Sequence, residues 1–200
     1  MPLHLEKKAI RALGVAESFR ANEVKSTLVG VVMRSDLVLD GFAINQLTVS
    51  GSDATRSVLK LFQKLHRNDI NAIMISGSVL SLYNVLDITE IYKDLRIPVV
   101  ALSFRKAKSD LYRNVEAEFP EATANKKLKL LEKLGDSTRQ KLVTGYSVFV
   151  RSAGIGDVES SKLLNKFTLQ GAVPEPVRVA RLLAKSLLDS YGGLRAASCG

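Results

Sequence analysis

Ser76 is the first residue whose surroundings could support catalysis, because it is followed by Gly77 directly after an apolar stretch. A serine hydrolase presents its nucleophile on such a turn, but within a Gly-x-Ser-x-Gly motif and with a histidine partner. That motif is missing. Neither His4, near the start of the sequence, nor His66, at the end of a helical pattern, is placed as a partner. The sequence therefore does not predict a serine hydrolase.

Gly154-Ile155-Gly156 could bring the backbone close to a phosphate group. It lacks the third glycine and the following acid of a dinucleotide-binding fingerprint. We interpret it as a turn before a helix that begins at Asp157. Phosphate binding at the start of that helix stays open, because the free N–H groups of a helix N-terminus attract anions.

The charge balance favours a polyanionic partner. The sequence has 29 Lys and Arg residues against 20 Asp and Glu residues, a formal net charge of +9. The basic residues concentrate at 105–108, 126–133 and 178–185. Such runs are either solvated helix faces or contacts to nucleic acid, and the charge pattern alone leaves both interpretations open.

The composition predicts one folded domain that spans residues 1–200 and ends in a flexible tail, 192–200. Hydrophobic residues make up 46% and charged residues 24%, which is typical of a globular protein. Cys199, the one cysteine, has no partner for an internal disulfide, which favours a cytoplasmic location. No apolar run nears the roughly 20 residues of a membrane helix, so no membrane partner is predicted.

The first half of the sequence predicts an antiparallel meander and then a helix. Apolar and β-branched stretches at 12–16, 27–33 and 37–49 predict three strands, with Gly41 as a bend in the third. Asp53 precedes apolar residues at helical spacing, and we expect its carboxylate to cap that helix.

The second half alternates strands and helices, which favours parallel pairing. Strands are predicted at 72–75, 97–102 and 147–150, and helices at 85–95, 109–119, 122–134, 157–167 and 177–191. A meander followed by a helix and by parallel strands with crossover helices is the order of a ribonuclease-H-like fold. The predicted fold class is therefore α/β, with helices on both faces of a mixed sheet.

Five segments carry a more specific indication of the protein family: residues 11–19, 29–34, 49–55, 84–88 and 174–180. The most specific of them contains Pro174-Glu175-Pro176-Val177-Arg178. In these segments the sequence resembles endonuclease V and, more closely, its archaeal relatives in the endonuclease dU family. The resemblance implies cleavage of DNA at deaminated bases by Mg²⁺, which carboxylates hold at the ends of neighbouring strands.

The positions that match the family's active site are substituted. The family has an Asp-Asp pair after the first strand, an Asp-Gly after the third and after the fourth strand, and a His in the closing helix. This sequence has Ala16, Ser50, Ser76 and Arg181 at the corresponding positions. Alanine cannot bind a metal, serine is a poor Mg²⁺ ligand and a guanidinium repels a cation, so the resemblance does not extend to the family's ordinary mechanism.

Four acids remain near these segments: Glu17, Asp53, Asp87 and Glu175. They could form a displaced metal site, and Mg²⁺ is the expected cofactor only in that case. Each also has a structural interpretation, as a surface acid (Glu17), a helix cap (Asp53) or a residue in the first turn of a helix (Asp87 and Glu175).

Three functions follow, in order of preference. The first is a nucleic-acid-binding relative of these endonucleases, with lost or weakened cleavage and with DNA as the expected partner. The second is an active Mg²⁺-dependent repair endonuclease, and the third is a scaffold that keeps only the fold. The expected phosphate contacts are Arg105, Lys106, Lys108, Arg178 and Arg181. The sequence indicates neither the base recognised nor the oligomeric state.

Overall fold

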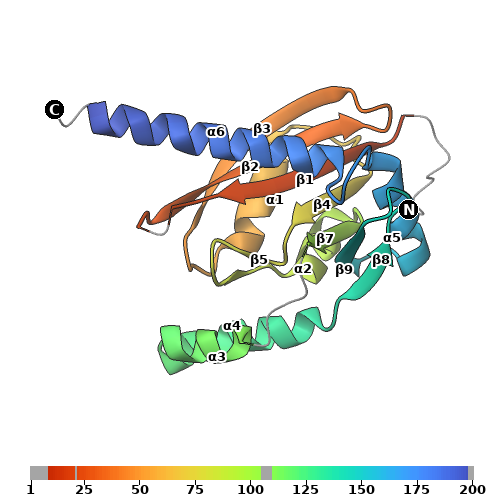
Figure 1. Ribbon diagram of the computed structural model, residues 1–200. Helices are drawn as coiled ribbons and strands as arrows, with labels where there is room; N and C mark the ends of the chain where they lie inside the picture. Colours follow the sequence, from red (N-terminus) through yellow and green to blue (C-terminus); the bar gives the residue numbers. More distant parts are fainter. Residues whose placement is uncertain (1–8, 21, 105–109, 198–200) are drawn as a thin grey trace.

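A seven-stranded mixed sheet forms the centre of the protein in a computed structural model, which describes residues 9–20, 22–104 and 110–197 (Figure 1). The strand order is β3-β2-β1-β4-β7-β9-β8, and β5 and β6 form a separate hairpin. The strands are β1 (Arg11–Ser18), β2 (Lys25–Arg34), β3 (Leu39–Thr48), β4 (Ala72–Ser76), β5 (Val79–Leu80), β6 (Asn84–Val85), β7 (Val99–Ser103), β8 (Thr138–Lys141) and β9 (Ser147–Ala153). The helices are α1 (Ala54–Lys64), α2 (Ile88–Leu95), α3 (Leu111–Glu118), α4 (Glu121–Leu134), α5 (Asp157–Phe167) and α6 (Glu175–Ala197).

The predicted antiparallel meander is confirmed. Strand β2 pairs with β1 on one side and with β3 on the other, both antiparallel. The register of β3 shifts between Val32 and Met33, opposite Gly41, which has a φ of 148°. The expected bend at Gly41 is therefore a β-bulge, and a glycine is required there because other residues rarely adopt this φ.

Three parallel strands continue the sheet. Strand β4 lies between β1 and β7 and runs parallel to both, with Ile73 opposite Val99. The predicted strand at 147–150 is β9, which returns antiparallel to β7. The edge strand β8 was not predicted from the sequence, because Gln140 is the one buried residue among its four and no apolar pattern marks it.

Helices cover both faces of the sheet, as predicted. Helices α1 and α2 pack on the face that carries Leu13, Val15 and Ile73. Helices α5 and α6 pack on the opposite face, which carries Ala12 and Met74. Figure 1 shows α6 lying across β1 and β2, with α3 and α4 set apart at the other side of the molecule. None of the helices within the described residues is long and apolar enough to cross a bilayer.

Helix α6 lies directly on the backbone of β1. A Cβ atom at Gly14 would collide with the backbone of Pro176 and Val177. Only glycine allows this close approach, which fixes the start of the helix over the middle of the strand. The helix continues to Ala197, so residues 192–197 of the expected tail are helical, and the flexibility of 192–200 stays a prediction.

The helix predicted at 85–95 begins three residues later, at Ile88. Asn84 and Val85 pair instead with Leu80 and Val79 in the β5–β6 hairpin. The helical hairpin of α3 and α4 packs on this small sheet, around Val115, Ala124 and Leu131. These three segments form a layer beside the main sheet, next to the ends of its parallel strands.

Candidate nucleic-acid interface at the carboxyl edge of the sheet

The carboxyl ends of β1, β4 and β7 meet at one border of the sheet, because the three strands are parallel. We call this border the carboxyl edge; it contains residues 16–18, Ser76 and Ser103. Ala16 and Ser76 directly follow Val15 and Ile75, the last residues that pair between β1 and β4. The topology therefore brings two of the substituted family positions to neighbouring strand ends.

Ala16 is fully buried beneath helix α6. It belongs to a hydrophobic cluster with Val29 and Val31 of the sheet and with Ala180 and Ala184 of the helix. A methyl group fills this position between two packed layers, where a carboxylate would lose its water. The alanine is thus accommodated by the packing around it.

Glu17 is not the surface acid considered from the sequence, since three hydrogen bonds hold its carboxylate. Ser26 Oγ donates to it over 2.9 Å, while the backbone N–H and the Oγ of Ser81 donate over 3.1 and 3.0 Å. Ser81 and Leu82 both have positive φ values, 42° and 72°. The carboxylate therefore ties the end of β1 to the unusual turn between β5 and β6.

Asp53 does not cap helix α1 with its side chain, which corrects the expectation from the sequence. Its carboxylate accepts hydrogen bonds from the N–H and Oγ1 of Thr48 and from Nδ2 of Asn84. Asn84 supplies the cap instead, because its Oδ1 accepts from the N–H of Ala54. Burial raises the pKa of Asp53, but the hydrogen bonds from Asn84 and Thr48 outweigh it and hold the pKa below its ordinary value.

Ser50, the family position after β3, lies in a turn with a φ of 55°. The buried ammonium of Lys127 in α4 donates to the carbonyl oxygens of Ser50, Gly51 and Tyr83. It also lies 4.5 Å from the centre of the Phe119 ring. Burial lowers the pKa of Lys127. Lys127 is consequently a structural cation that joins α4 to the turn after β3 and to the turn between β5 and β6.

Asp87 is the N-cap of helix α2 rather than a residue within its first turn. Its carboxylate accepts from the N–H groups of Thr89 and Glu90 and forms a salt bridge with Lys133. Burial raises the pKa of Asp87, and the bonds from Lys133 and Glu90 outweigh that effect, so the pKa lies below its ordinary value. These partners account for the carboxylate without a metal.

Glu175 occupies the first turn of helix α6, as its structural interpretation predicts. The residue is 5% exposed, and its Oε2 accepts two hydrogen bonds from Arg178. Its Oε1 has no hydrogen-bond partner within the described residues. The bond to Glu175 raises the pKa of Arg178 and commits its guanidinium largely to this pair.

Arg181 extends from helix α6 over the Phe104 ring, 4.9 Å from the ring centre. Phe104 directly follows β7, so this contact lies at the carboxyl edge. Arg181 is exposed, and it has no ion pair or hydrogen bond among the residues that the structure describes. Its N–H donors are therefore available to an external anion.

Within the part of the chain that the structure describes, the residues do not fit a Mg²⁺ ion. No group of three or more Asp, Glu, His or Cys side chains within the described ranges could hold a metal. Glu17, Asp53 and Asp87 are each committed to neighbouring donors. The displaced metal site considered from the sequence thus has no geometric support in the described part of the chain.

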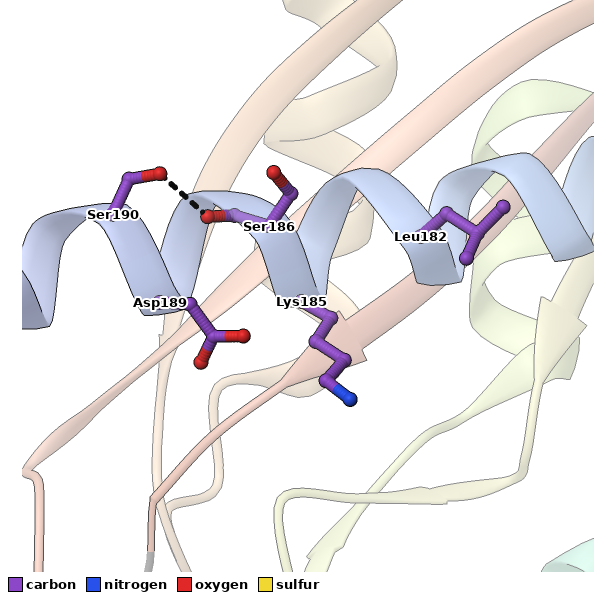
Figure 2. Close-up of a pocket in the computed structure, with 5 residues that line it drawn as sticks. All are labelled: Leu182, Lys185, Ser186, Asp189 and Ser190. Carbon is purple, nitrogen blue, oxygen red and sulfur yellow. Dashed lines mark hydrogen bonds between the residues drawn. The ribbon is translucent and has the colours of Figure 1, made fainter.

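The remaining basic candidates are distributed along helix α6 or lie outside the described residues, as Arg105, Lys106 and Lys108 do. Figure 2 shows a shallow hollow on α6 beyond Arg181, where Lys185 and Asp189 extend on the same side of the helix. Asp189 also lies 3.6 Å from Arg20. The acid offsets the cations at this hollow, so Arg181 is the better-placed basic residue.

Sequence reasoning missed the roles of Ser81, Asn84 and Lys127. Lys127 had a detectable signal, because it falls on the same helical face as Ala124 and Leu131, both buried. Asn84 lay within a segment that carried the family resemblance. Its role was not predictable because its amide accepts from Ala54 and donates to Thr48, which are 30 and 36 residues away. Ser81 had no signal, because no motif marks a single serine between Leu80 and Leu82.

Solved structures with the same fold include endonuclease V proteins. A protein of unknown function from Archaeoglobus fulgidus has a TM-score of 0.76 and 26% identity, covering 90% of this chain and 98% of that one. Human ENDOV has a TM-score of 0.63 and 15% identity, covering 92% and 86%. Endonuclease V from Ciona intestinalis, in complex with a DNA that contains an inosine, has a TM-score of 0.60 and 12% identity, covering 92% and 87%. The fold is that of endonuclease V.

The sequence comparisons define the family within this class. The profile of the endonuclease dU family matches residues 8–188, so the chain belongs to the endonuclease dU family. A UPF0215 protein from Thermoplasma volcanium is 35% identical over 188 residues, which are 92% of this chain and 92% of that protein. A UPF0215 protein from Pyrobaculum calidifontis is 29% identical over 177 residues, 88% of this chain and 96% of that protein.

Proposed function

We propose that this protein binds nucleic acid, with DNA as the partner, at the carboxyl edge of its sheet and does not cleave the backbone by a metal-dependent mechanism. The position of Arg181 carries the proposal. An arginine whose donors face solvent stands at the edge, on a helix that the fold fixes against β1. A guanidinium binds a phosphate with two parallel hydrogen bonds and needs no metal.

The protein is proposed not to cleave DNA because the positions that match the family's metal ligands are substituted. Hydrolysis of a phosphodiester by Mg²⁺ requires carboxylates that hold the ion against the phosphate and the attacking water. Ala16 and Ser76 stand at two of these positions, and Glu17 is bound to Ser26 and Ser81. A fixed cation at the same border can neutralise a phosphate, but it cannot generate a hydroxide.

The partner is inferred from the family and from charge. The net charge of +9 attracts polyanions over several ångströms, and the endonuclease V fold has been solved with an inosine-containing DNA in the Ciona protein. We take DNA as the partner for this chain on that basis.

Binding titrations with and without Mg²⁺ test the proposal. The substrate is a labelled duplex containing one inosine, titrated at about 50 and about 200 mM salt, with the DNA examined for nicks afterwards. Binding that weakens steeply with salt and leaves the DNA intact supports the proposal. Mg²⁺-dependent nicks support an active endonuclease instead, and absence of binding at the lower salt supports a scaffold.

A further inference from the structure

Strands β9 and β8 continue the sheet beyond β7, and β8 carries exposed residues. Phe149 of β9 lies opposite Ser103 at the end of β7 and, on its other side, opposite Arg139 of β8. Two residues further along the hairpin, Lys141 pairs with Ser147. Strand pairing therefore connects Ser103 at the carboxyl edge, through β9, to Arg139 and Lys141 of β8.

The alternation of the strands places these basic residues and the phenylalanine on one face. Gln140 and its partner Val148 are buried toward α5, where Gln140 Nε2 donates to Ser160 Oγ over 2.8 Å. Neighbouring residues in a strand point to opposite faces. Arg139, Lys141 and Phe149 consequently share the face that α5 does not cover, and we call these three residues the β8–β9 strip.

Phe149 lies outside the hydrophobic clusters of the described chain. It is partly exposed and belongs to none of the hydrophobic clusters, whereas Phe104 packs against the cluster beneath α5 and α6. Arg139 and Lys141 are exposed and, among the described residues, have no ion pair or side-chain hydrogen bond. The strip thus combines an aromatic ring with two uncommitted cations.

We infer that the β8–β9 strip binds a single-stranded segment of nucleic acid. The inference rests on the proposed function and deepens it. A base can stack on the Phe149 ring because every base has a π face, and the flanking cations can meet the phosphates. In an intact duplex the bases already stack on one another, so the ring offers no comparable contact. A strand that leaves the carboxyl edge meets the strip directly, since Phe149 pairs with Ser103.

Arg139 and Lys141 also have a second interpretation, because charged residues on an edge strand discourage pairing with other chains. That role requires the charges but not the aromatic ring. Edge protection therefore predicts self-association of the charge variants, whereas nucleic-acid binding predicts a specific effect at Phe149.

The experiment compares the affinities of a labelled oligothymidine and of a duplex hairpin for four proteins: wild type, F149L, R139Q/K141Q and the matched control R56Q/K60Q. Arg56 and Lys60 are exposed on α1, with no ion pair within the described residues. We expect F149L to weaken single-strand binding about fivefold or more with an unchanged salt slope. R139Q/K141Q should reduce that slope by about 1.4, or 0.7 for each lost contact. Duplex binding and the control should change less than twofold.

Two further measurements keep the outcomes distinct. F149Y retains a ring and should restore single-strand affinity. In size-exclusion chromatography, R139Q/K141Q should elute at the same volume as the wild type, without self-association. One outcome overturns single-strand binding by the strip but leaves the proposed function in place. In that outcome F149L and R139Q/K141Q bind oligothymidine as tightly as the wild type does, while R181Q still weakens duplex binding. Failure of the wild type to bind either probe overturns both.

Discussion

The guanidinium of Arg181 lies 4.9 Å from the centre of the Phe104 ring, so helix α6 and the end of β7 together position one cation at the carboxyl edge. In the resemblance to endonuclease V, this helix position carries a histidine. The exchange turns a position that can support a metal site into one that attracts phosphate directly. If the motif matching is right, the carboxylates that it predicts to be missing and the guanidinium of Arg181 lie at one border of the sheet.

Arg181→Gln should weaken DNA binding and lower its salt dependence. Loss of one phosphate contact on a duplex reduces the slope of log affinity against log salt by about 0.9. The measurement is a fluorescence anisotropy titration at several salt concentrations. Arg56→Gln on helix α1, also exposed and unpaired in the described chain, is the matched control and should leave the slope unchanged. An equal loss in both variants would indicate general charge attraction rather than a site at Arg181.

Lys127→Met should destabilise the fold, although a lysine on a helix is usually exposed. The change leaves three carbonyl groups without their buried donor, those of Ser50, Gly51 and Tyr83. We expect the free energy of unfolding to fall by about 2–3 kcal/mol, measured by urea denaturation. Lys126→Met at the neighbouring exposed position should change it by less than about 0.5 kcal/mol. Similar effects in the two variants would contradict the role given to Lys127.

Asp53 should contribute to acid sensitivity. Its folded-state pKa lies below the ordinary value of 3.8, so the unfolded chain takes up a proton there at higher pH than the folded chain. The stabilisation is fully present above about pH 4 and is lost as the pH falls through the folded-state pKa. Asp53→Asn should therefore be less stable than the wild type at pH 7, and the difference should shrink toward pH 3. A difference that is constant across this range in thermal unfolding would rule out this contribution.

Introducing carboxylates at the positions that match the family's metal ligands should lower the stability of the metal-free protein and increase its metal binding. In A16D/S76D/R181H the new carboxylate at position 16 lies beneath Ala180 and Ala184, and an uncompensated buried charge costs about 3–5 kcal/mol. We expect a lower melting temperature in metal-free buffer and a rise on addition of Mg²⁺ or Mn²⁺, because a bound ion stabilises the folded state. A16D/S76A/R181H, which lacks the second carboxylate, serves as the control and should show a smaller rise. Equal metal responses would argue against an ion held between β1 and β4.

Periodicity predicted most of the fold because the main strands and helices bury regular apolar patterns. The meander, the parallel pair of Ile73 and Val99 and the helix at 157–167 follow from such patterns. Strand β8 escaped because its four residues are mostly polar and exposed. The start of α2 was predicted too early because Asn84 and Val85 form a strand of only two residues, which pairs with an equally short strand.

The candidate site was only partly accessible from sequence. Alignment of motifs located Ala16, Ser76 and Arg181, and the register places the first two at neighbouring strand ends. The environments of the acids could not be predicted, because their partners are distant in sequence. Glu17 meets Ser81 across 64 residues and Asp87 meets Lys133 across 46. Whether a carboxylate is free for a metal depends on such contacts.

The most direct test of the central claim is a nicking assay on an inosine-containing and a uracil-containing duplex, with Mg²⁺ and protein in excess over DNA. Excess protein makes the assay sensitive to a single slow turnover, and a gel shift in the same buffer reports binding. We predict that the duplex is shifted by bound protein and stays intact. Robust Mg²⁺-dependent nicking by the unmodified protein, abolished by Glu17→Gln or Asp53→Asn, would contradict it and establish an enzyme with a rearranged site.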